Sequence, residues 1–173
     1  MRRAEKRMNS TTRELAATMD GAAFRDRAVA AFSADNPPAD VVSDLARDVH
    51  PDTALIEAAL KGQPWTEVPH STLEERAKDI VALTLPAFVH YVPAFMCAAL
   101  ERPDGDCATY AMYALCPLGG YDAFYEGTCA LFTKEQAKLI EQFLKALEKD
   151  PSFTLFTEEI QPGRELWKRR ANA

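Results

Sequence analysis

Apolar residues in this chain recur every three to four positions, which is the spacing of one face of an α-helix. Phe24, Ala28 and Phe32 are each four positions apart. The stretch 137–147 carries an apolar stripe, with lysines and glutamates at the intervening positions. No segment of the sequence shows the sustained alternation of apolar and polar residues that half-buried β-strands require. The sequence therefore predicts an all-α protein.

Capping residues, glycines and prolines mark where the helices begin and end. A Ser or Thr followed three residues later by Glu or Gln forms a capping box, and this pattern occurs at 11–14, 71–74 and 133–136. Asp20 is placed to cap a helix that begins near Gly21, and Gly62 is placed to close another. From these signals we expect a single irregular bundle of about six to eight helices.

The charge and proline distribution suggests how the 173 residues are organised. A chain of this length buries enough surface to form one core without disulfides or metals. Residues 1–13 are strongly basic, which is typical of a flexible lead. We expect one helical domain over residues 14–150. Pro151 then predicts the start of a C-terminal extension, residues 151–173, with a short helix near its end.

The longest window without a charge, residues 80–100, contains Pro93. A proline inside a helix lacks a backbone N–H and collides with the carbonyl four residues earlier. Two arrangements are therefore open: one central helix kinked around Pro93, which we expect, or two helices that meet there. The window also holds His90 and Tyr91, and charged residues lie directly at both ends. We interpret it as buried core and not as a membrane span.

The cysteines indicate packing and not chemistry. Cys97, Cys107, Cys116 and Cys129 form no Cys-x-x-Cys pair, the spacing typical of zinc sites and redox couples. The N-terminus lacks the apolar run of a secretory signal, so we expect a cytoplasmic protein. In that reducing compartment the four thiols are expected to be free and buried.

No set of residues in the sequence identifies a reaction. The only histidines are His50, His70 and His90, and no nucleophile elbow, phosphate-binding loop or zinc-binding motif accompanies them. His90 and Cys97 are seven positions apart, close to two helical turns, but Pro93 lies between them. We predict no catalytic residue, no cofactor and no metal site. Whether the protein is an enzyme stays open, and the sequence favours a non-catalytic role.

Acidic residues dominate the body of the chain. The formal net charge is −6, yet residues 14–163 hold 24 acidic and 11 basic residues, a net charge of −13. Such a surface repels nucleic-acid phosphates and attracts cationic partners. Our leading hypothesis is a binding protein whose acidic helical surface docks a basic protein, for example as an immunity or antidote protein against a cationic toxin. We expect neither nucleic acid nor a membrane as partner, and the oligomeric state stays open.

A concentration of aromatic residues in the middle of the chain supports an alternative. Tyrosine and tryptophan combine an apolar body with a polar tip, as binding sites need. The candidate pocket or interaction residues are Trp65, Tyr91, Phe95, Tyr110 and Tyr113. If they line a pocket, the protein binds a small molecule or is a weak enzyme; the same residues also fill ordinary helical cores.

Several segments together resemble an uncharacterised family of small bacterial helical proteins, known as a domain of unknown function. The resemblance rests on Gly62-Gln63-Pro64-Trp65, on the stretch 83–95 and on Leu131-Phe132-Thr133. The family's core motif is Tyr-x-x-Pro-Ala-Phe, and His90 stands here where the resemblance implies another tyrosine or a similar aromatic residue. The resemblance covers roughly residues 22–150 and implies the limits of the fold. It implies no activity and no functional residue.

Overall fold

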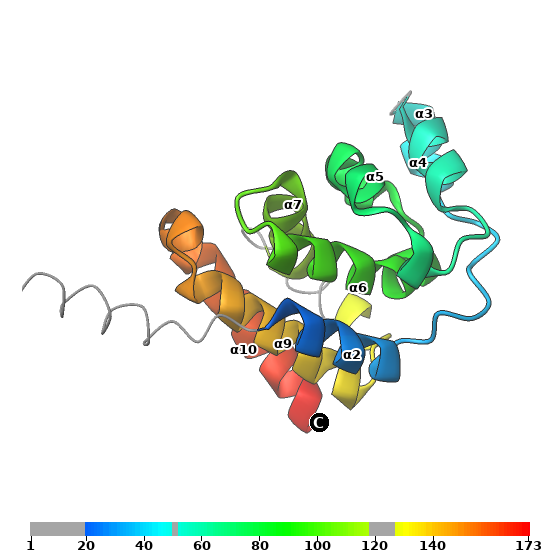
Figure 1. Cartoon of the computed structure of the whole chain (residues 1–173). Helices are drawn as coiled ribbons and strands as arrows, with labels where there is room; N and C mark the ends of the chain where they lie inside the picture. Colours follow the sequence, from blue (N-terminus) through cyan, green and yellow to red (C-terminus); the bar gives the residue numbers. More distant parts are fainter. Residues whose placement is uncertain (1–19, 50–51, 118–126) are drawn as a thin grey trace, which may run out of the picture.

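A computed structural model describes residues 20–49, 52–117 and 127–173 (Figure 1). Within these residues all regular elements are helical, and one isolated antiparallel bridge joins Val42 to Leu83. The all-α prediction is therefore confirmed. The α-helices are α2 (Gly21–Ala31), α3 (Asp44–Val49), α4 (Thr53–Leu60), α5 (His70–Glu75), α6 (Leu85–Glu101), α7 (Asp106–Leu115), α9 (Lys134–Lys149) and α10 (Thr157–Asn172). The described residues also form three 3-10 helices: η1 (Trp65–Glu67), η2 (Ala77–Ala82) and η3 (Pro151–Phe156).

Helix α2 begins and packs as the sequence predicts. The Asp20 carboxylate accepts a hydrogen bond from the backbone N–H of Ala22, which caps the helix. Phe24 and Ala28 lie on one face of the helix and are buried, and Phe32, the extended residue directly after it, is buried as well. The basic lead 1–13 and the first capping box, at 11–14, lie outside the described residues.

Helix α6 is the central element of the core. It is capped by Thr84, whose hydroxyl accepts the N–H of Ala87, and residues 91–99 are all buried. Pro93 lies inside this one continuous helix, so the single-helix arrangement is the one present. The proline leaves the Val89 carbonyl without its usual helical N–H partner. No helix in the described part of the chain has both the length and the apolar character of a membrane span.

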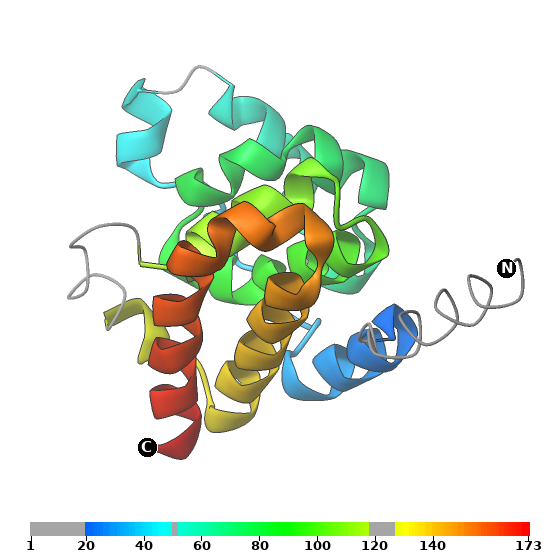
Figure 2. The same cartoon turned by 90° about the vertical axis from the view of Figure 1, so that its left-hand side faces the viewer.

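Helices α9 and α10 form an antiparallel pair joined by η3, as Figure 2 shows. The capping box at the start of α9 is confirmed. The Thr133 hydroxyl accepts the N–H of Gln136, and the Gln136 amide oxygen accepts the N–H of Thr133. The face of α9 that carries Ile140, Phe143 and Leu144 is buried.

The residues after Pro151 differ from the expected short-helix extension. They form η3 and the 16-residue helix α10, and Phe153, Ile160 and Trp167 belong to the core. Pro162 lies inside α10 and interrupts the sequence pattern from which helices are recognised. The core therefore continues from residue 24 to residue 167.

Two local predictions around α4 and α5 need correction. The capping box at 71–74 does not open a helix, because α5 already begins at His70 and has no side-chain cap. The helix expected after Ser71 is divided into α5 and η2. Val41 and Val42 precede α3 and are buried in the core. By contrast, Gly62 follows α4 with a φ of 74°, the left-handed conformation that glycine adopts without strain.

The cysteines are free and buried, as predicted. Burial raises the pKa of the Cys97 thiol to about 11 and that of Cys116 to about 12, and it also raises the pKa of Cys107. These three thiols are therefore protonated at neutral pH, and the thiolate that nucleophilic chemistry needs is suppressed.

Candidate functional site

The five aromatic candidates do not gather around a shared pocket. Trp65, Tyr91 and Phe95 lie in the core with at most 1% of their surface exposed. The Trp65 indole N–H donates to the Phe32 carbonyl at 3.3 Å, and the Tyr91 hydroxyl donates to the carbonyls of Leu60 and Gln63. Burial also raises the pKa of Tyr91 to about 12. These polar tips are satisfied inside the protein, which is typical of core aromatics.

Tyr110 and Tyr113 lie elsewhere, half-buried on α7. The Tyr113 ring meets the Phe156 ring edge to face, with ring centres 6.0 Å apart. This contact joins α7 to the end of η3. In this structure the aromatic concentration therefore serves mainly to pack helices together.

The acidic surplus is unevenly distributed over the described residues. Residues 40–57 contain five acidic residues and one basic residue, a net charge of −4. Residues 134–172, which form α9, η3 and α10, contain seven acidic and eight basic residues, a net charge of +1. In Figures 1 and 2 the α3–α4 segment lies at one end of the molecule, well apart from α10. The segment around α3 and α4 is thus clearly more negative than the α9–α10 pair.

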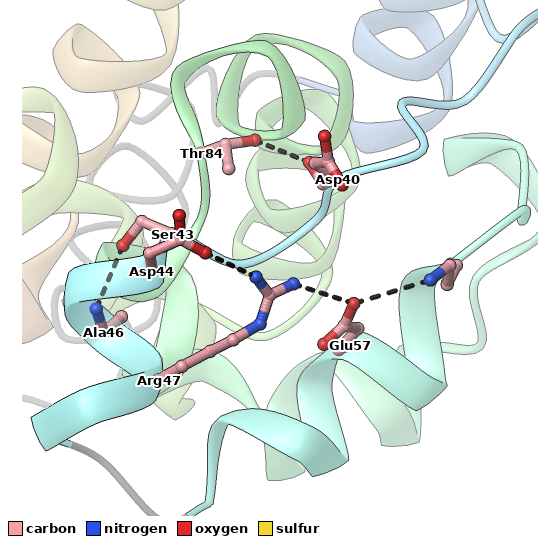
Figure 3. Close-up of polar contacts among 8 residues, drawn as sticks. Asp40, Ser43, Asp44, Ala46, Arg47, Glu57 and Thr84 are labelled. Atoms are coloured by element: carbon pink, nitrogen blue, oxygen red, sulfur yellow. Dashed lines mark hydrogen bonds and ion pairs between the residues drawn. The ribbon is translucent and has the colours of Figure 1, made fainter.

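Hydrogen bonds, one of them at the start of α3 and others to the start of α6, hold α3 and the residues before it in place (Figure 3). The Ser43 hydroxyl accepts the N–H of Ala46 at 3.2 Å and caps the helix. The Thr84 hydroxyl donates to the Asp40 carbonyl at 2.7 Å, and the N–H of Thr84 donates to the Val41 carbonyl. These bonds attach the segment before α3 to the start of α6.

Arg47 connects α3 to α4. Its guanidinium donates to the Asp44 carboxylate at 2.9 Å and to the Glu57 carboxylate at 3.0 Å (Figure 3). The hydrogen bond from Arg47 lowers the pKa of Glu57, and Lys61 lies 3.6 Å from the same oxygen. The one basic residue of the segment is therefore engaged with two of its five carboxylates.

The remaining carboxylates are less compensated. Asp52 lies 3.6 Å from Lys78, whereas Asp40 and Asp48 are exposed and form no ion pair with any described residue. On α3, successive residues are turned by about 100°, which places Asp44 and Asp48 on one side of the helix. This arrangement leaves a negative potential that faces solvent.

Apolar side chains lie directly beside these carboxylates. Leu45 is 75% exposed and Val49 60%, and the four-residue spacing between them places both on the strip of α3 next to Asp44 and Asp48. Leu55, on α4, is 53% exposed. We call the exposed set Asp40, Asp44, Leu45, Asp48, Val49, Asp52 and Leu55 the α3–α4 face. Because three large apolar residues are exposed within 11 positions, this face is unlike the singly scattered hydrophobics of an ordinary surface.

The sequence contains a signal for this face that composition alone does not reveal. Asp40, Asp44, Asp48 and Asp52 recur at every fourth position. In a continuous helix such a repeat aligns carboxylates on one side. Here Asp44 and Asp48 lie on α3, whereas Asp40 precedes α3 and Asp52 precedes α4. Leu45 and Val49 repeat the same spacing one residue later. The exposure of Leu45, Val49 and Leu55 was not predictable, because the same apolar positions would also suit a buried face.

A second polar cluster, around Glu74, has a structural role. The Glu74 carboxylate accepts the N–H of Asp106 at 2.9 Å and that of Cys107 at 3.4 Å, which caps α7 from a neighbouring helix. His70 lies between Glu74 and Glu101, at 3.4 and 2.9 Å. Among the described residues no group of three or more His, Cys, Asp or Glu side chains is arranged to hold a metal ion.

The chain matches no protein-family model, no curated protein and no solved structure. The resemblance noted in the sequence therefore stays a prediction.

Proposed function

We propose that this protein is a non-catalytic binding protein whose α3–α4 face docks a basic, amphipathic segment of a partner protein. One observation carries the proposal: on α3, the exposed Leu45 and Val49 lie next to the carboxylates of Asp44 and Asp48. A segment that fits this face carries lysine or arginine beside leucine-like side chains.

The two components of the face make different contributions to binding. The net charge of −4 over residues 40–57 attracts a cationic partner and accelerates its association, an effect that salt screens. The apolar residues contribute affinity, because docking removes their surface from water. Each Å² of apolar surface that is buried stabilises the complex by about 25 cal/mol. Charge alone gives a weak and unspecific attraction. Carboxylates and exposed apolar side chains together select a partner segment that is both basic and amphipathic.

The near-neutral α9–α10 pair supports assigning the docking role to one end of the molecule. A partner guided by charge is attracted to α3 and α4 and has no comparable reason to approach the opposite end. An antidote that neutralises a cationic toxin is one protein of this class.

A defined peptide tests the proposal. The probe is a fluorescently labelled 18-residue peptide of leucine and lysine, designed as an amphipathic helix and titrated against the full chain. A peptide of the same composition, scrambled so that no apolar face forms, is the control. We expect saturable binding of the amphipathic peptide, at least tenfold tighter than that of the scrambled peptide, with affinity that decreases between 50 and 300 mM salt. Equal binding of both peptides, or binding that salt does not change, contradicts the proposal.

Two double variants locate the site. Asp40→Asn with Asp48→Asn should weaken binding and reduce its salt dependence, because it removes the two carboxylates without an ion pair. Leu45→Ser with Val49→Ser should weaken binding at all salt concentrations. The control is Glu135→Gln with Glu158→Gln, which removes two exposed carboxylates of α9 and α10, outside the α3–α4 face. If the control weakens binding as much as the Asp40 and Asp48 variant does, the docking face is wrong.

A further inference from the structure

A groove separate from the α3–α4 face lies between the loop that follows α2, the first turns of α6 and the start of α9. Its volume is about 650 Å³, within the range of about 300–1,000 Å³ typical of small-molecule sites. Phe32, Pro38, Leu85, Pro86, Val89 and Leu131 supply its apolar walls. Leu85 and Leu131 are 44% and 49% exposed, so their side chains are available to a ligand.

Two of the five polar side chains of the groove, Gln136 and Ser33, already have hydrogen-bond partners. The Gln136 amide accepts the N–H of Thr133 and donates to the Ala31 carbonyl. The Ser33 hydroxyl accepts the N–H of Asp35. These groups position the walls, and they have less capacity left to recognise a ligand.

Asp35 and Asn36 form the polar rim. Asn36 has a φ of 56°, a left-handed conformation that asparagine tolerates better than most residues, and it turns the chain at this point. The Asp35 carboxylate is the one formal charge among the groove-lining residues, and it forms no ion pair with any described residue. A ligand in this groove therefore meets an apolar surface with a negative charge at its edge.

His90, from α6, also lines the groove. Burial lowers the pKa of His90, and the nearby backbone carbonyl of Gln63 opposes this shift only in part. Its ring is therefore uncharged at neutral pH and does not repel a cation. The His90 ring packs edge to face on Tyr91, with ring centres 4.6 Å apart, which holds it against the core.

We propose that this groove binds a small organic amine, with the apolar body of the amine on Leu85, Val89 and Leu131 and its ammonium group beside the Asp35 carboxylate. The assignment follows from charge complementarity and from the apolar walls. It goes beyond the docking of a protein partner, and it involves none of the residues of the α3–α4 face.

Three matched probes test the proposal: hexylamine, 1-hexanol and hexanoate, which share one apolar chain and differ in the charge of the head group. The measurement is an NMR titration of the full chain at pH 7 that follows the methyl groups of Leu85, Val89 and Leu131. We expect the methyl signals of all three residues to shift with hexylamine, to respond less to 1-hexanol, and to respond least to hexanoate. Binding of hexanoate as tight as that of hexylamine, or no shift of these methyl groups with any probe, overturns the proposal.

Two variants distinguish the contribution of the Asp35 charge to binding from that of the apolar walls. Asp35→Asn should weaken the binding of hexylamine by up to about fivefold, the upper limit for an exposed ion pair, and leave the binding of 1-hexanol unchanged. Leu131→Trp should fill the groove and weaken the binding of hexylamine and of 1-hexanol to the same extent. The controls are Asp26→Asn on α2 and Leu155→Trp, at a residue that is 90% exposed on η3. The proposal is contradicted if Asp35→Asn still binds hexylamine more tightly than 1-hexanol by the original ratio. It is also contradicted if the control variants lose as much affinity for the probes as the groove variants do.

Discussion

At the scale of single residues, the fold depends on buried polar tips that reach backbone carbonyls far away in the sequence. The Trp65 indole bonds to the Phe32 carbonyl and the Trp167 indole to the Leu115 carbonyl, the latter at 2.7 Å. The Tyr91 hydroxyl bonds to the end of α4 and to the loop after it. Each bond satisfies a group whose burial without a partner would cost about 1–3 kcal/mol.

Tyr91→Phe tests this role directly. The substitution removes the hydroxyl and leaves the Leu60 and Gln63 carbonyls without that donor. We expect the free energy of unfolding to decrease by about 1–2 kcal/mol, as measured by urea denaturation. Tyr110→Phe, at a half-buried residue, is the matched control and should change stability by less than about 0.5 kcal/mol. Equal effects of both substitutions would show that the Tyr91 hydrogen bonds contribute little.

His90 gives the protein a pH dependence on the acid side. The pKa of His90 is lower in the folded protein than the ordinary value of 6.5 that applies to the unfolded chain. As the pH falls below 6.5, the unfolded chain takes up a proton before the folded protein does. The contribution of His90 to stability is therefore complete above pH 6.5 and decreases as the pH falls through the folded-state pKa.

The measurement compares urea denaturation at pH 7.5 and pH 5.5 in the original chain and in His90→Gln. We expect a smaller loss of stability on acidification in the variant, because it lacks this titrating group. The same loss in both proteins would mean that burial of His90 is not linked to folding.

At the scale of elements, helix ends are stabilised by side chains from neighbouring helices. Glu74 on α5 caps α7, and Arg170 on α10 donates to the Phe132 carbonyl just before α9. The capping box of α9 and the Gly62 turn after α4 were predictable, because their partners are three or fewer residues away. The Glu74 cap was not, because its partners Asp106 and Cys107 are more than 30 positions away.

Glu74→Ala should therefore destabilise the protein by about 1 kcal/mol, the usual effect of losing a helix cap. Glu75→Ala is the control on the adjacent residue, whose side chain is 70% exposed, pairs with Arg76 and caps no helix among the described residues. Thermal unfolding followed by circular dichroism gives the comparison. A midpoint lowered equally by both substitutions would argue against the cap.

Packing of α10 requires a residue without a side chain at position 163. A Cβ atom on Gly163 would lie 2.5 Å from the Cys116 sulfur and 3.2 Å from the Cys116 Cα. Gly163→Ala should therefore destabilise the protein by about 1–2 kcal/mol, even though alanine favours helix formation. Gly127→Ala, where nothing lies within 4 Å of the new Cβ, should be neutral or slightly stabilising. Urea denaturation of both variants measures the difference, and similar stabilities contradict the packing.

The same packing explains why α10 was difficult to predict. Gly163 and Pro162 are residues that normally indicate a helix end, yet here the glycine permits close approach to Cys116. The partners of α10 are remote in sequence, so no local pattern indicates that the residues after Pro151 belong to the core. The helical character and the caps of α2 and α9 depend on local spacing, which is why the sequence predicts them.

At the scale of the whole molecule, charge and exposed apolar surface coincide at one end. The sequence predicted an acidic body from composition, but composition cannot locate the charge in space. The structure assigns a net charge of −4 to residues 40–57 and +1 to residues 134–172. The role of the aromatic candidates could not be predicted from the sequence either. Trp65, Tyr91 and Phe95 suit a core and a pocket equally well until their burial is known.

The most direct test of the docking proposal is to map the bound leucine–lysine peptide on the full chain by backbone amide NMR. We expect the shifted amides to cluster in α3, α4 and the residues before them, between residues 40 and 57, and the amides of α9 and α10 to stay unchanged. Shifts spread over the whole surface, or concentrated in α9 and α10, would contradict it.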